Sequence, residues 1–222
     1  MTTHILVLGA TGPSGLDFVH AALREGHTLT LYLRNAAKLP TEVKGNALVT
    51  VIQGQLDDQA SLEKAASCGS QSVVSFLGPV IGGGPKNAPS ILQGYENLVP
   101  KLIAHDFKRG LFLSTPSYNS PEDSWAPGWY LIISLLWLTL NWAYRDVVGF
   151  STYIASQPVD KLRWTLFRVP NLRSGPARPV VTTFKGKDRF NWNLERKALA
   201  EWVLLELKQD RWIGRAPVLY NA

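Results

Sequence analysis

The sequence holds a single cysteine and shows no secretion signal. Cys68 has no second cysteine to pair with, which excludes an intramolecular disulfide and suits a reducing compartment, so we expect a cytoplasmic protein. The first predicted strand begins at His4, which leaves no room for a signal peptide. The sequence also lacks any G-x-S-x-G elbow of a serine hydrolase. No pair of histidines has the spacing of metal ligands, so we expect no bound metal.

Long runs of like charge are missing as well. The formal net charge is +6, but lysine and arginine are scattered, and we expect no nucleic-acid partner. We attribute the positive net charge to lysines and arginines on a solvated surface and to residues that bind a phosphorylated cofactor. With 45% hydrophobic and 18% charged residues among 222, the composition predicts one globular domain over residues 1–222.

No apolar stretch reaches the ~20 residues that a membrane-spanning helix needs. One mainly apolar segment without charge, WYLIISLLWLTLNWAY over 129–144, is rich in tryptophan and tyrosine. We expect a helix here that packs on the protein's own core, or one that forms a lid or wall over an apolar substrate. Contact with a membrane surface and a homodimer interface are the minor alternatives.

What the sequence does contain is a glycine-rich turn between a strand and a helix. Residues 5–34 read ILVLGATGPSGLDFVHAALREGHTLTLYLR, an apolar strand, the turn, an amphipathic helix and a second strand. Gly9 permits the tight turn, Gly12 allows close approach of a pyrophosphate, and Gly15 lets the helix lie against the strand. The helix N-terminus offers N–H groups to the phosphates. This block predicts a dinucleotide site, the alternative being a turn kept for packing only.

The residue that follows the second strand indicates which dinucleotide is bound. Arg34 lies about 20 residues beyond the turn, where an acidic residue binds the ribose hydroxyl of NAD. A guanidinium there pairs instead with a 2′-phosphate. The sequence therefore predicts NADP(H) as the cofactor.

Strands alternate with helices along the whole chain. We predict a Rossmann-like, doubly wound α/β fold, with a mostly parallel sheet, helices on both faces and a small C-terminal part that covers the substrate. Residues 115–160 and 170–192 are the expected substrate-side elements, and 78–90 is expected to form a mobile loop near the substrate. The predicted strands are 4–8, 28–33, 47–52, 72–76, 110–114, 163–168 and 180–184, with an edge strand at 217–220. The predicted helices are 13–25, 57–67, 91–105, 129–155 with a break at Gly149, and 193–208.

Three segments together resemble one family. The turn GATGPSG, the strand WTLFRVPNL (164–172) and the helix RKALAEWVLLEL (196–207) are similar to atypical short-chain dehydrogenase/reductases of the NmrA-like and biliverdin-reductase-B-like kind. The resemblance spans nearly the whole chain. It implies an NADP-binding Rossmann-like domain and, for most members, a reductase reaction.

The resemblance also implies a set of residues around the cofactor. The pyrophosphate would be held by Gly9, Thr11, Gly12, Pro13, Ser14 and Gly15, and the 2′-phosphate by Arg34 with Lys38. The remaining contacts would be Leu56 and Asp57 at the adenine, Leu77 and Gly78 at the nicotinamide ribose, Ser114 and Thr115 beside the nicotinamide, and Pro170, Asn171 and Leu172 at its carboxamide. Leu56 and Leu77 could equally be core residues, and Lys38 a solvated surface lysine.

The chain departs from short-chain dehydrogenases in the Tyr-x-x-x-Lys pair. Tyr144 is followed four residues later by Val148, and Tyr130 and Tyr153 also lack the lysine. Candidate catalytic groups are Ser114, Thr115, Tyr118, Tyr144 and Asp146. For Asp146 we favour a role in capping a helix turn.

Three functions are compatible with these features. The first is an NADPH-dependent reductase of a bulky apolar or aromatic small molecule, indicated by the cofactor block and a tryptophan-rich wall of Trp125, Trp129, Trp137 and Trp142. The second is a non-redox isomerase, epimerase or cyclase of secondary metabolism on the same scaffold. The third is an NADP-sensing regulator, which the NmrA-like resemblance allows.

Overall fold

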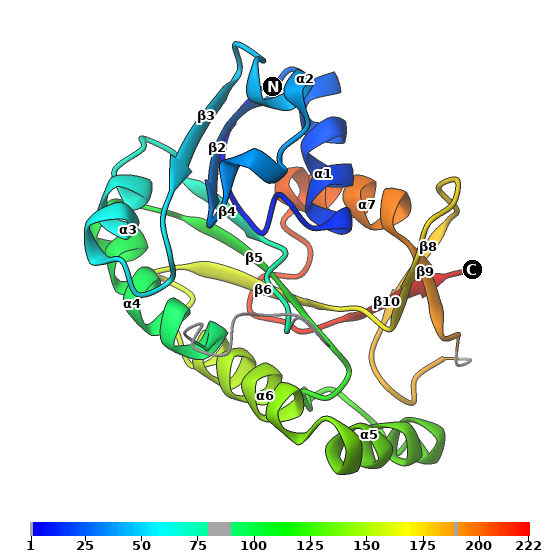
Figure 1. The fold of residues 1–222 in the computed structure, drawn as a ribbon. Coiled ribbons are helices and arrows are strands. Elements are labelled where there is room, and N and C mark those ends of the chain that lie inside the picture. Colours follow the sequence, from blue (N-terminus) through cyan, green and yellow to red (C-terminus); the bar gives the residue numbers. More distant parts are fainter. Residues whose placement is uncertain (1, 80–89, 189–190) are drawn as a thin grey trace.

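The computed structural model describes residues 2–79, 90–188 and 191–222. Its centre is an eight-stranded sheet of order β3-β2-β1-β4-β5-β6-β10-β8 (Figure 1). Its strands are parallel except β8, which runs antiparallel to β10. In chain order they are β1 (His4–Leu8), β2 (Thr28–Leu33), β3 (Val49–Gln53), β4 (Ser72–Ser75), β5 (Arg109–Ser114), β6 (Arg163–Arg168), β8 (Val180–Thr183) and β10 (Val218–Asn221). The predicted Rossmann-like fold is confirmed.

Helices cover both faces of this sheet, as predicted. On one face lie α1 (Pro13–Arg24) and α7 (Arg196–Gln209); on the other lie α3 (Gln59–Ala66), α4 (Ile91–Ala104) and α6 (Asn141–Ala155) (Figure 1). The short elements η1 (Ala36–Lys38) and α2 (Thr41–Lys44) join β2 to β3. Asp58 caps α3 by accepting a hydrogen bond from the Ser61 N–H at 3.1 Å.

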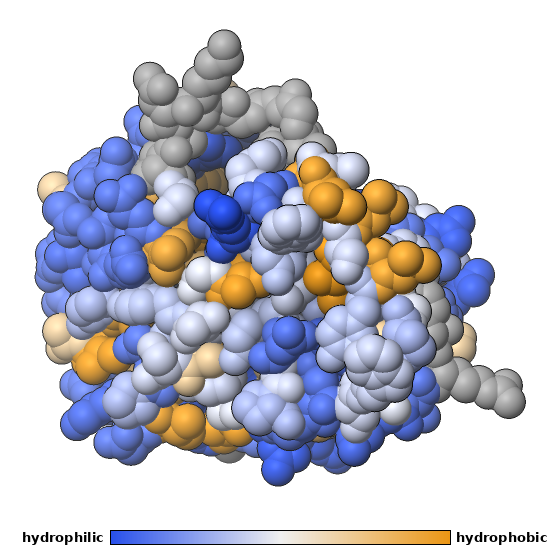
Figure 2. Space-filling view, turned by 90° about the horizontal axis from the view of Figure 1, so that it is seen from below, coloured by the Kyte–Doolittle hydropathy of each residue, from blue (hydrophilic) through white to orange (hydrophobic). Residues whose placement is uncertain are grey.

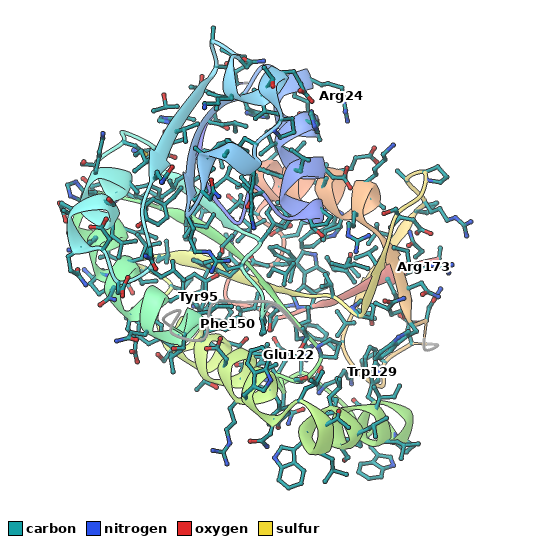
Figure 3. The ribbon with its side chains drawn as sticks, in the orientation of Figure 1. Arg24, Tyr95, Glu122, Trp129, Phe150 and Arg173 are labelled. Carbon is teal, nitrogen blue, oxygen red and sulfur yellow. The ribbon has the colours of Figure 1, made fainter. Side chains whose placement is uncertain are left out.

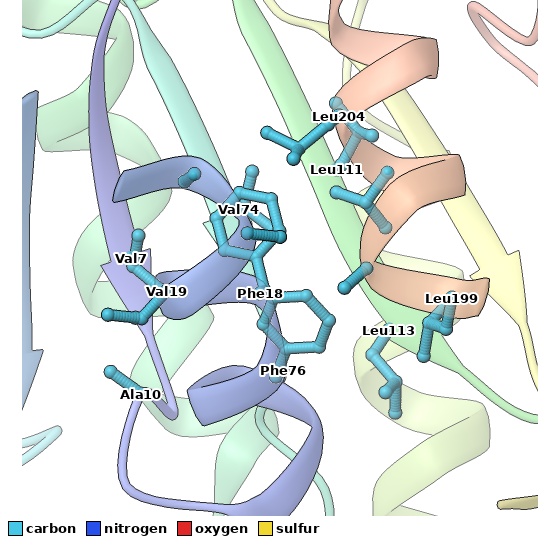
Figure 4. Packing of buried hydrophobic residues seen from close by; sticks show 14 of the residues in the cluster. Val7, Ala10, Phe18, Val19, Val74, Phe76, Leu111, Leu113, Leu199 and Leu204 are labelled. Carbon is cyan, nitrogen blue, oxygen red and sulfur yellow. The ribbon is translucent and has the colours of Figure 1, made fainter. Parts of the chain in front are cut away.

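The central strands are apolar throughout because both faces of the sheet are buried. In β1, Ile5 and Val7 join the core beneath α1 and α7, whereas Leu6 and Leu8 join the core beneath α3, α4 and α6. Aromatic rings fill both cores. Phe18 and Phe76 lie 5.2 Å apart between α1 and the sheet (Figure 4). Tyr95 and Phe150 meet at 5.6 Å on the opposite side (Figure 3).

The C-terminal part differs from the predicted order of elements. A small two-stranded sheet, which the prediction missed, pairs β7 (Asn171–Arg173) with β9 (Asn193–Glu195). The last helix therefore begins at Arg196, not at residue 193, because Asn193 pairs with Asn171 as part of a strand. The strand predicted at the sheet edge is β10, and it lies between β6 and β8. The edge prediction was wrong because β8 returns antiparallel and pairs with the outer side of β10.

The predicted helix over 129–155 is two helices. α5 (Pro127–Thr139) meets α6 at Leu140, whose backbone is not helical (φ −132°, ψ 45°), and the two axes are bent by 117°. The break was predicted at Gly149, which instead lies within α6. A Cβ at Gly149 would lie 3.1 Å from Leu92 Cδ2, so this glycine allows α6 to approach α4 closely.

The packing of α5 also differs from the favoured expectation. Within α5 only Trp129 is buried, although its sequence is apolar almost throughout. The expectation of a helix packed on the protein's own core is therefore wrong for most of α5. Within the described residues no single helix is long and apolar enough to cross a membrane. The bent pair of α5 and α6 meets that criterion only when the two are joined. Residues 80–89, the greater part of the predicted mobile loop, lie outside the described residues.

Candidate functional site

The glycine-rich turn at the end of β1 has the geometry that its sequence predicted. Gly9 has φ +76°, and a Cβ there would lie 2.8 Å from the carbonyl carbon of Phe76, the residue that follows β4. A Cβ at Gly15 would lie 2.3 Å from the Gly9 carbonyl oxygen. Both distances are shorter than real Cβ contacts, so the turn closes between β1 and α1 only with glycine at these positions.

The N-terminus of α1 is open at this turn. Gly12 is the N-cap residue and supplies no capping side chain, and Pro13 occupies the first helical position. Within the described part of the chain, no side chain caps the first turn of α1. A Cβ at Gly12 would come no nearer than 3.4 Å to its closest neighbour, the Gly9 oxygen, so space remains in front of the turn. N–H groups and the helix dipole therefore favour an anion such as a pyrophosphate here.

Two cations lie after the neighbouring strand. Leu8 pairs with Tyr32 in the parallel register of β1 and β2, so the residues that follow β2 lie beside the glycine turn. Arg34 is exposed, and no carboxylate among the described residues pairs with it. Asn35 orders the following turn, since its Oδ1 accepts a hydrogen bond from the Ala37 N–H at 2.9 Å. Lys38 is exposed in η1. A phosphate beside the ribose of a nucleotide would fit this arrangement.

Leu56 and Leu77 are partly buried at the same edge of the sheet. Leu56 packs against α4 so closely that a Cβ at Gly94 would lie 2.8 Å from it, and its carbonyl accepts a hydrogen bond from Asn97 at 3.1 Å. Leu77 also packs against the core of the α4 face. Asp57 is exposed, and Gly78 is partly buried. Both leucines thus contribute to packing, whatever ligand they also border.

The loops after β5 and β6 lie side by side. The Val169 N–H donates to the Ser114 carbonyl at 3.0 Å, and the Ser114 side chain is fully buried, with its hydroxyl 2.7 Å from that of Ser151 in α6. Thr115 is the more accessible hydroxyl, and its Oγ1 accepts from the Ser117 N–H at 3.3 Å. The three residues that follow Val169 are at least partly accessible; they are Pro170, Asn171 and Leu172.

The remaining catalytic candidates have different surroundings. Both carboxylate oxygens of Asp146 accept hydrogen bonds at 3.2 Å from the N–H groups of Ile91 and Leu92, so Asp146 caps α4 from the side of α6. Tyr118 is half-buried, and burial raises the pKa of its hydroxyl. Tyr144 lies on α6 and faces a cavity together with residues of α5.

A buried ionic cluster, which the sequence did not reveal, holds the loop between β5 and α5. Arg168 is 0% exposed and donates to both carboxylate oxygens of Asp123, at 2.7 Å each. Lys185 donates through its backbone N–H to the same carboxylate at 3.0 Å and through Nζ to Asn119 at 2.5 Å. Arg168 also donates to the Tyr118 carbonyl at 2.9 Å. No local pattern signals this cluster, because its members lie far apart in the sequence.

Burial and neighbouring charges together shift the pKa values of Asp123 and Lys185 in this cluster. Burial alone would raise the pKa of Asp123, but the hydrogen bonds and charge of Arg168 outweigh burial and hold that pKa below its usual value. Burial lowers the pKa of Lys185, and Arg168 lowers it further, while Asp123 opposes both effects. The cluster is thus a buried carboxylate shared by two cations, of which Arg168 is the closer partner.

A cavity of about 320 Å³ lies between α5, α6 and this loop. Lys185 Nζ lies 5.8 Å from the ring centre of Tyr130 at its border. The lining combines aromatic rings with a few polar groups: Asn119, Tyr130, Ile133, Ser134, Trp137 and Tyr144. Of the four tryptophans of the predicted wall, only Trp137 lines this cavity. The ring of Trp129 packs on that of Trp192, with 5.4 Å between their centres (Figure 3). Trp125 and Trp142 are exposed.

Among the described residues, no group of three histidine, cysteine, aspartate or glutamate side chains is placed to hold a metal ion. The described site therefore combines a helix N-terminus suited to an anion, two exposed cations and a cavity lined by aromatic rings. The helix N-terminus and the two cations lie at the carboxyl ends of the parallel strands, where α/β sheets bind ligands. The cavity lies between the two helices that follow β5 along the chain.

Solved structures with the same fold are numerous. One is a short-chain dehydrogenase/reductase from Veillonella parvula, solved in complex with NADP (TM-score 0.80, 17% identity, covering 100% of this chain and 95% of that one). Another is ChuY, an anaerobillin reductase from Escherichia coli O157:H7 (0.77, 15%, 99% and 97%). A third is a putative epimerase from Bacteroides thetaiotaomicron (0.77, 16%, 100% and 99%). At these identities the likeness shows the fold.

The family is shown by the sequence itself. The profile of the NAD(P)H-binding family matches residues 9–210, from the first glycine of the turn to the end of the last helix. The match includes the turn, the strand of Arg168 and α7, the three segments on which the resemblance depended. The chain belongs to the NAD(P)H-binding family.

Proposed function

We propose that this protein is an NADPH-dependent reductase of a bulky apolar or aromatic small molecule. The observation that carries the proposal is the open N-terminus of α1 beside the glycine turn, with Arg34 next to it, a cation that no carboxylate of the described residues pairs with. The first feature suits a pyrophosphate and the second a 2′-phosphate. NADPH, when bound, supplies a hydride to an acceptor. The protein's part is then to orient the two and to exclude water.

The substrate class follows from the cavity between α5 and α6. Its lining by Tyr130, Trp137 and Tyr144 suits a flat, apolar molecule, and Asn119 and Ser134 offer hydrogen bonds that could fix its orientation. A volume of about 320 Å³ is within the usual range of small-molecule sites. The ionic cluster of Asp123 supports this role, because it holds Asn119 and the loop that borders the cavity.

The proton that accompanies the hydride needs a donor. Tyr144 is the best placed of the candidates, since it lines the cavity, and Tyr118 is second, with its hydroxyl pKa raised by burial. Thr115 is accessible at the end of β5, whereas the Ser114 hydroxyl is engaged by Ser151 and the Asp146 carboxylate by the N-terminus of α4. We therefore propose Tyr144 as the donor, with solvent as the source when no side chain serves.

Nucleotide titration tests the cofactor assignment. NADPH should bind more tightly than NADH in a fluorescence titration of the purified protein. Arg34→Ala should weaken NADPH by about 10- to 150-fold, since a hydrogen bond to a charged group contributes about 1.5–3 kcal/mol. NADH affinity should hardly change. Lys161→Ala, which removes an exposed cation before β6, is the matched control and should leave both affinities unchanged.

Two outcomes would contradict the reductase. If neither nucleotide binds at millimolar concentration, the family site has lost its ligand in this chain. If Arg34→Ala weakens NADPH and NADH equally, the 2′-phosphate assignment is wrong. If NADPH does bind, the reductase reaction is tested by measuring NADPH oxidation with a panel of quinones, flavins, enones and aldehydes.

A non-redox enzyme is the second candidate. The absence of the Tyr-x-x-x-Lys pair and the similarity to the putative epimerase favour it. Such an enzyme would bind NADPH tightly and leave it unoxidised across the whole panel. That result would favour an isomerase, epimerase or cyclase over the reductase.

A further inference from the structure

An exposed apolar surface covers α5 and its two flanks. Of the large hydrophobic side chains that are exposed, most lie between residues 125 and 142, and we call this group the α5 surface. Its members are Trp125, Tyr130, Leu131, Leu135, Trp137, Leu138 and Trp142. Figure 2 shows hydrophobic side chains gathered on the face of the molecule where α5 lies. Monomeric soluble proteins rarely expose contiguous apolar patches of large size.

The side chains of the α5 surface are arranged by helical spacing. Leu131, Leu135 and Leu138 recur at i, i+4 and i+7, and they are 75%, 60% and 71% exposed. Tyr130 and Trp137 follow the neighbouring row, which borders the cavity. The inner row contains Trp129, which is buried. One helix thus presents an apolar outer face and forms a wall of the cavity at the same time.

The chemistry of the α5 surface favours lipid over another protein. From Ser124 to Tyr144 the sequence contains no charged residue, whereas protein interfaces carry a polar rim with hydrogen bonds and charges. Three tryptophans and a tyrosine accompany the leucines, and these amphipathic rings are the residues enriched at membrane interfaces. The first charge that follows the surface is the exposed cation Arg145, and the first that precedes it, Asp123, has a buried side chain that pairs with Arg168. The chain as a whole has a net charge of +6. Positive charge beside an apolar surface is attracted to anionic lipid.

The dimensions of α5 decide how it would meet the lipid. A helix of 13 residues is about 20 Å long, shorter than the ~30 Å of a bilayer's hydrocarbon core. α6 turns away from α5 by 117° and packs on the sheet. α5 lies at the edge of the molecule in Figure 1, so its outer face can lie flat on a membrane without displacing the rest of the fold.

We propose that α5 docks the protein on the surface of an anionic lipid bilayer. The cavity between α5 and α6 then opens beside the lipid, so apolar molecules dissolved in the membrane can reach it directly. The second part of this inference rests on the proposed function, because it concerns the substrate of the reductase. The docking itself does not depend on that function.

Co-sedimentation with vesicles tests the proposal. The whole protein should sediment with vesicles of phosphatidylcholine and phosphatidylserine, more weakly with phosphatidylcholine alone, and less at high salt. The triple variant Leu131→Gln, Leu135→Gln, Leu138→Gln should lower the partition by about 30-fold or more, since each leucine loses apolar burial in the lipid. All three side chains are largely exposed, so the variant keeps its core. Its thermal melting should match that of the wild type.

A matched control separates the α5 surface from general apolar exposure. Leu48→Gln, Val159→Gln and Leu205→Gln together remove three other exposed apolar side chains and should leave vesicle binding unchanged. Brominated phosphatidylcholine should quench the fluorescence of the wild-type protein, because the exposed Trp125 and Trp142 enter the lipid, and it should quench the α5 variant less.

Three results would overturn the proposal. The first is that the wild type sediments with neither kind of vesicle at low salt. The second is that the α5 variant binds vesicles as well as the control does. The third is a wild-type dimer in light scattering that the α5 variant dissociates while vesicles stay unbound, which would assign the surface to a second copy. Vesicle binding without nucleotide binding would refute the reductase and leave the docking in place.

Discussion

The ionic cluster of Asp123 gives the sharpest prediction of stability. Its carboxylate accepts hydrogen bonds from both terminal nitrogens of Arg168 at 2.7 Å, from the Lys185 N–H at 3.0 Å and from the Ser120 N–H at 2.9 Å. Asp123→Asn keeps the shape of the side chain but removes its charge. It also replaces one acceptor oxygen by an NH₂ group, which cannot accept the hydrogen bonds that these N–H groups donate. Arg168, which is 0% exposed, is then left as a buried charge without a counterion.

Breaking a buried pair by removing one partner costs about 3–5 kcal/mol. For a chain of this size each kcal/mol lowers the melting temperature by about 2–4 °C, so we expect a fall of about 6–20 °C. Calorimetry or circular dichroism of the purified variant measures it. The matched control is Glu25→Gln, since Glu25 pairs with Lys208 at 2.6 Å on the surface and both side chains are more than two-fifths exposed. An exposed pair contributes about 1 kcal/mol or less.

The reasoning fails if Asp123→Asn melts within about 2 °C of the Glu25→Gln control. That result would mean that Arg168 finds water or another acceptor, and that the cluster does not hold the loop. A large fall in melting temperature with unchanged turnover would leave the cluster structural and would detach it from the cavity. Turnover of the variant is therefore measured well below its melting temperature.

The remaining predictions address acid stability, the turn and the two α6 side chains. Because the pKa of Asp123 is lower in the folded state than in the unfolded chain, its stabilisation is present above the unfolded value of about 3.9 and is lost as pH falls through the folded value. Asp123→Asn should therefore flatten the acid limb of a plot of melting temperature against pH, and an unchanged limb would contradict it. Gly15→Ala should abolish NADPH binding in a titration, because its Cβ would lie 2.3 Å from the Gly9 oxygen; retained affinity would show that the turn yields. Tyr144→Phe should lower kcat by about 100-fold and leave NADPH affinity unchanged if this hydroxyl donates the proton, and an unchanged kcat would refute that role. Asp146→Ala should cost about 1 kcal/mol in a urea titration through loss of the α4 cap, and a neutral result would show that Ser90 suffices.

The sequence by itself determined the sheet and the turn. Apolar runs such as ILVL are typical of strands buried on both faces of a covered parallel sheet. Gly9 is required by its own positive φ, and Gly15 by the clash of a Cβ with the Gly9 oxygen. These are local requirements, so a sequence pattern carries them. The predicted bounds of β1, β2 and β6 agree with the structure for the same reason.

Only the tertiary structure decided the features that join distant segments. The pair of β7 and β9 joins strands about 20 residues apart. The prediction placed the first within the substrate-side segment 170–192 and the second at the start of a helix. The cluster of Arg168 brings together side chains from one strand and two loops that lie far apart in the sequence, so no spacing of residues predicts it. The surroundings of the apolar helix were also undetermined. Its sequence is compatible with a buried helix, a lid or a membrane contact, because hydrophobicity shows that a side chain avoids water and does not show what covers it. The non-helical backbone at Leu140 turns α5 out from the core, and this bend decides which of these surroundings the helix has.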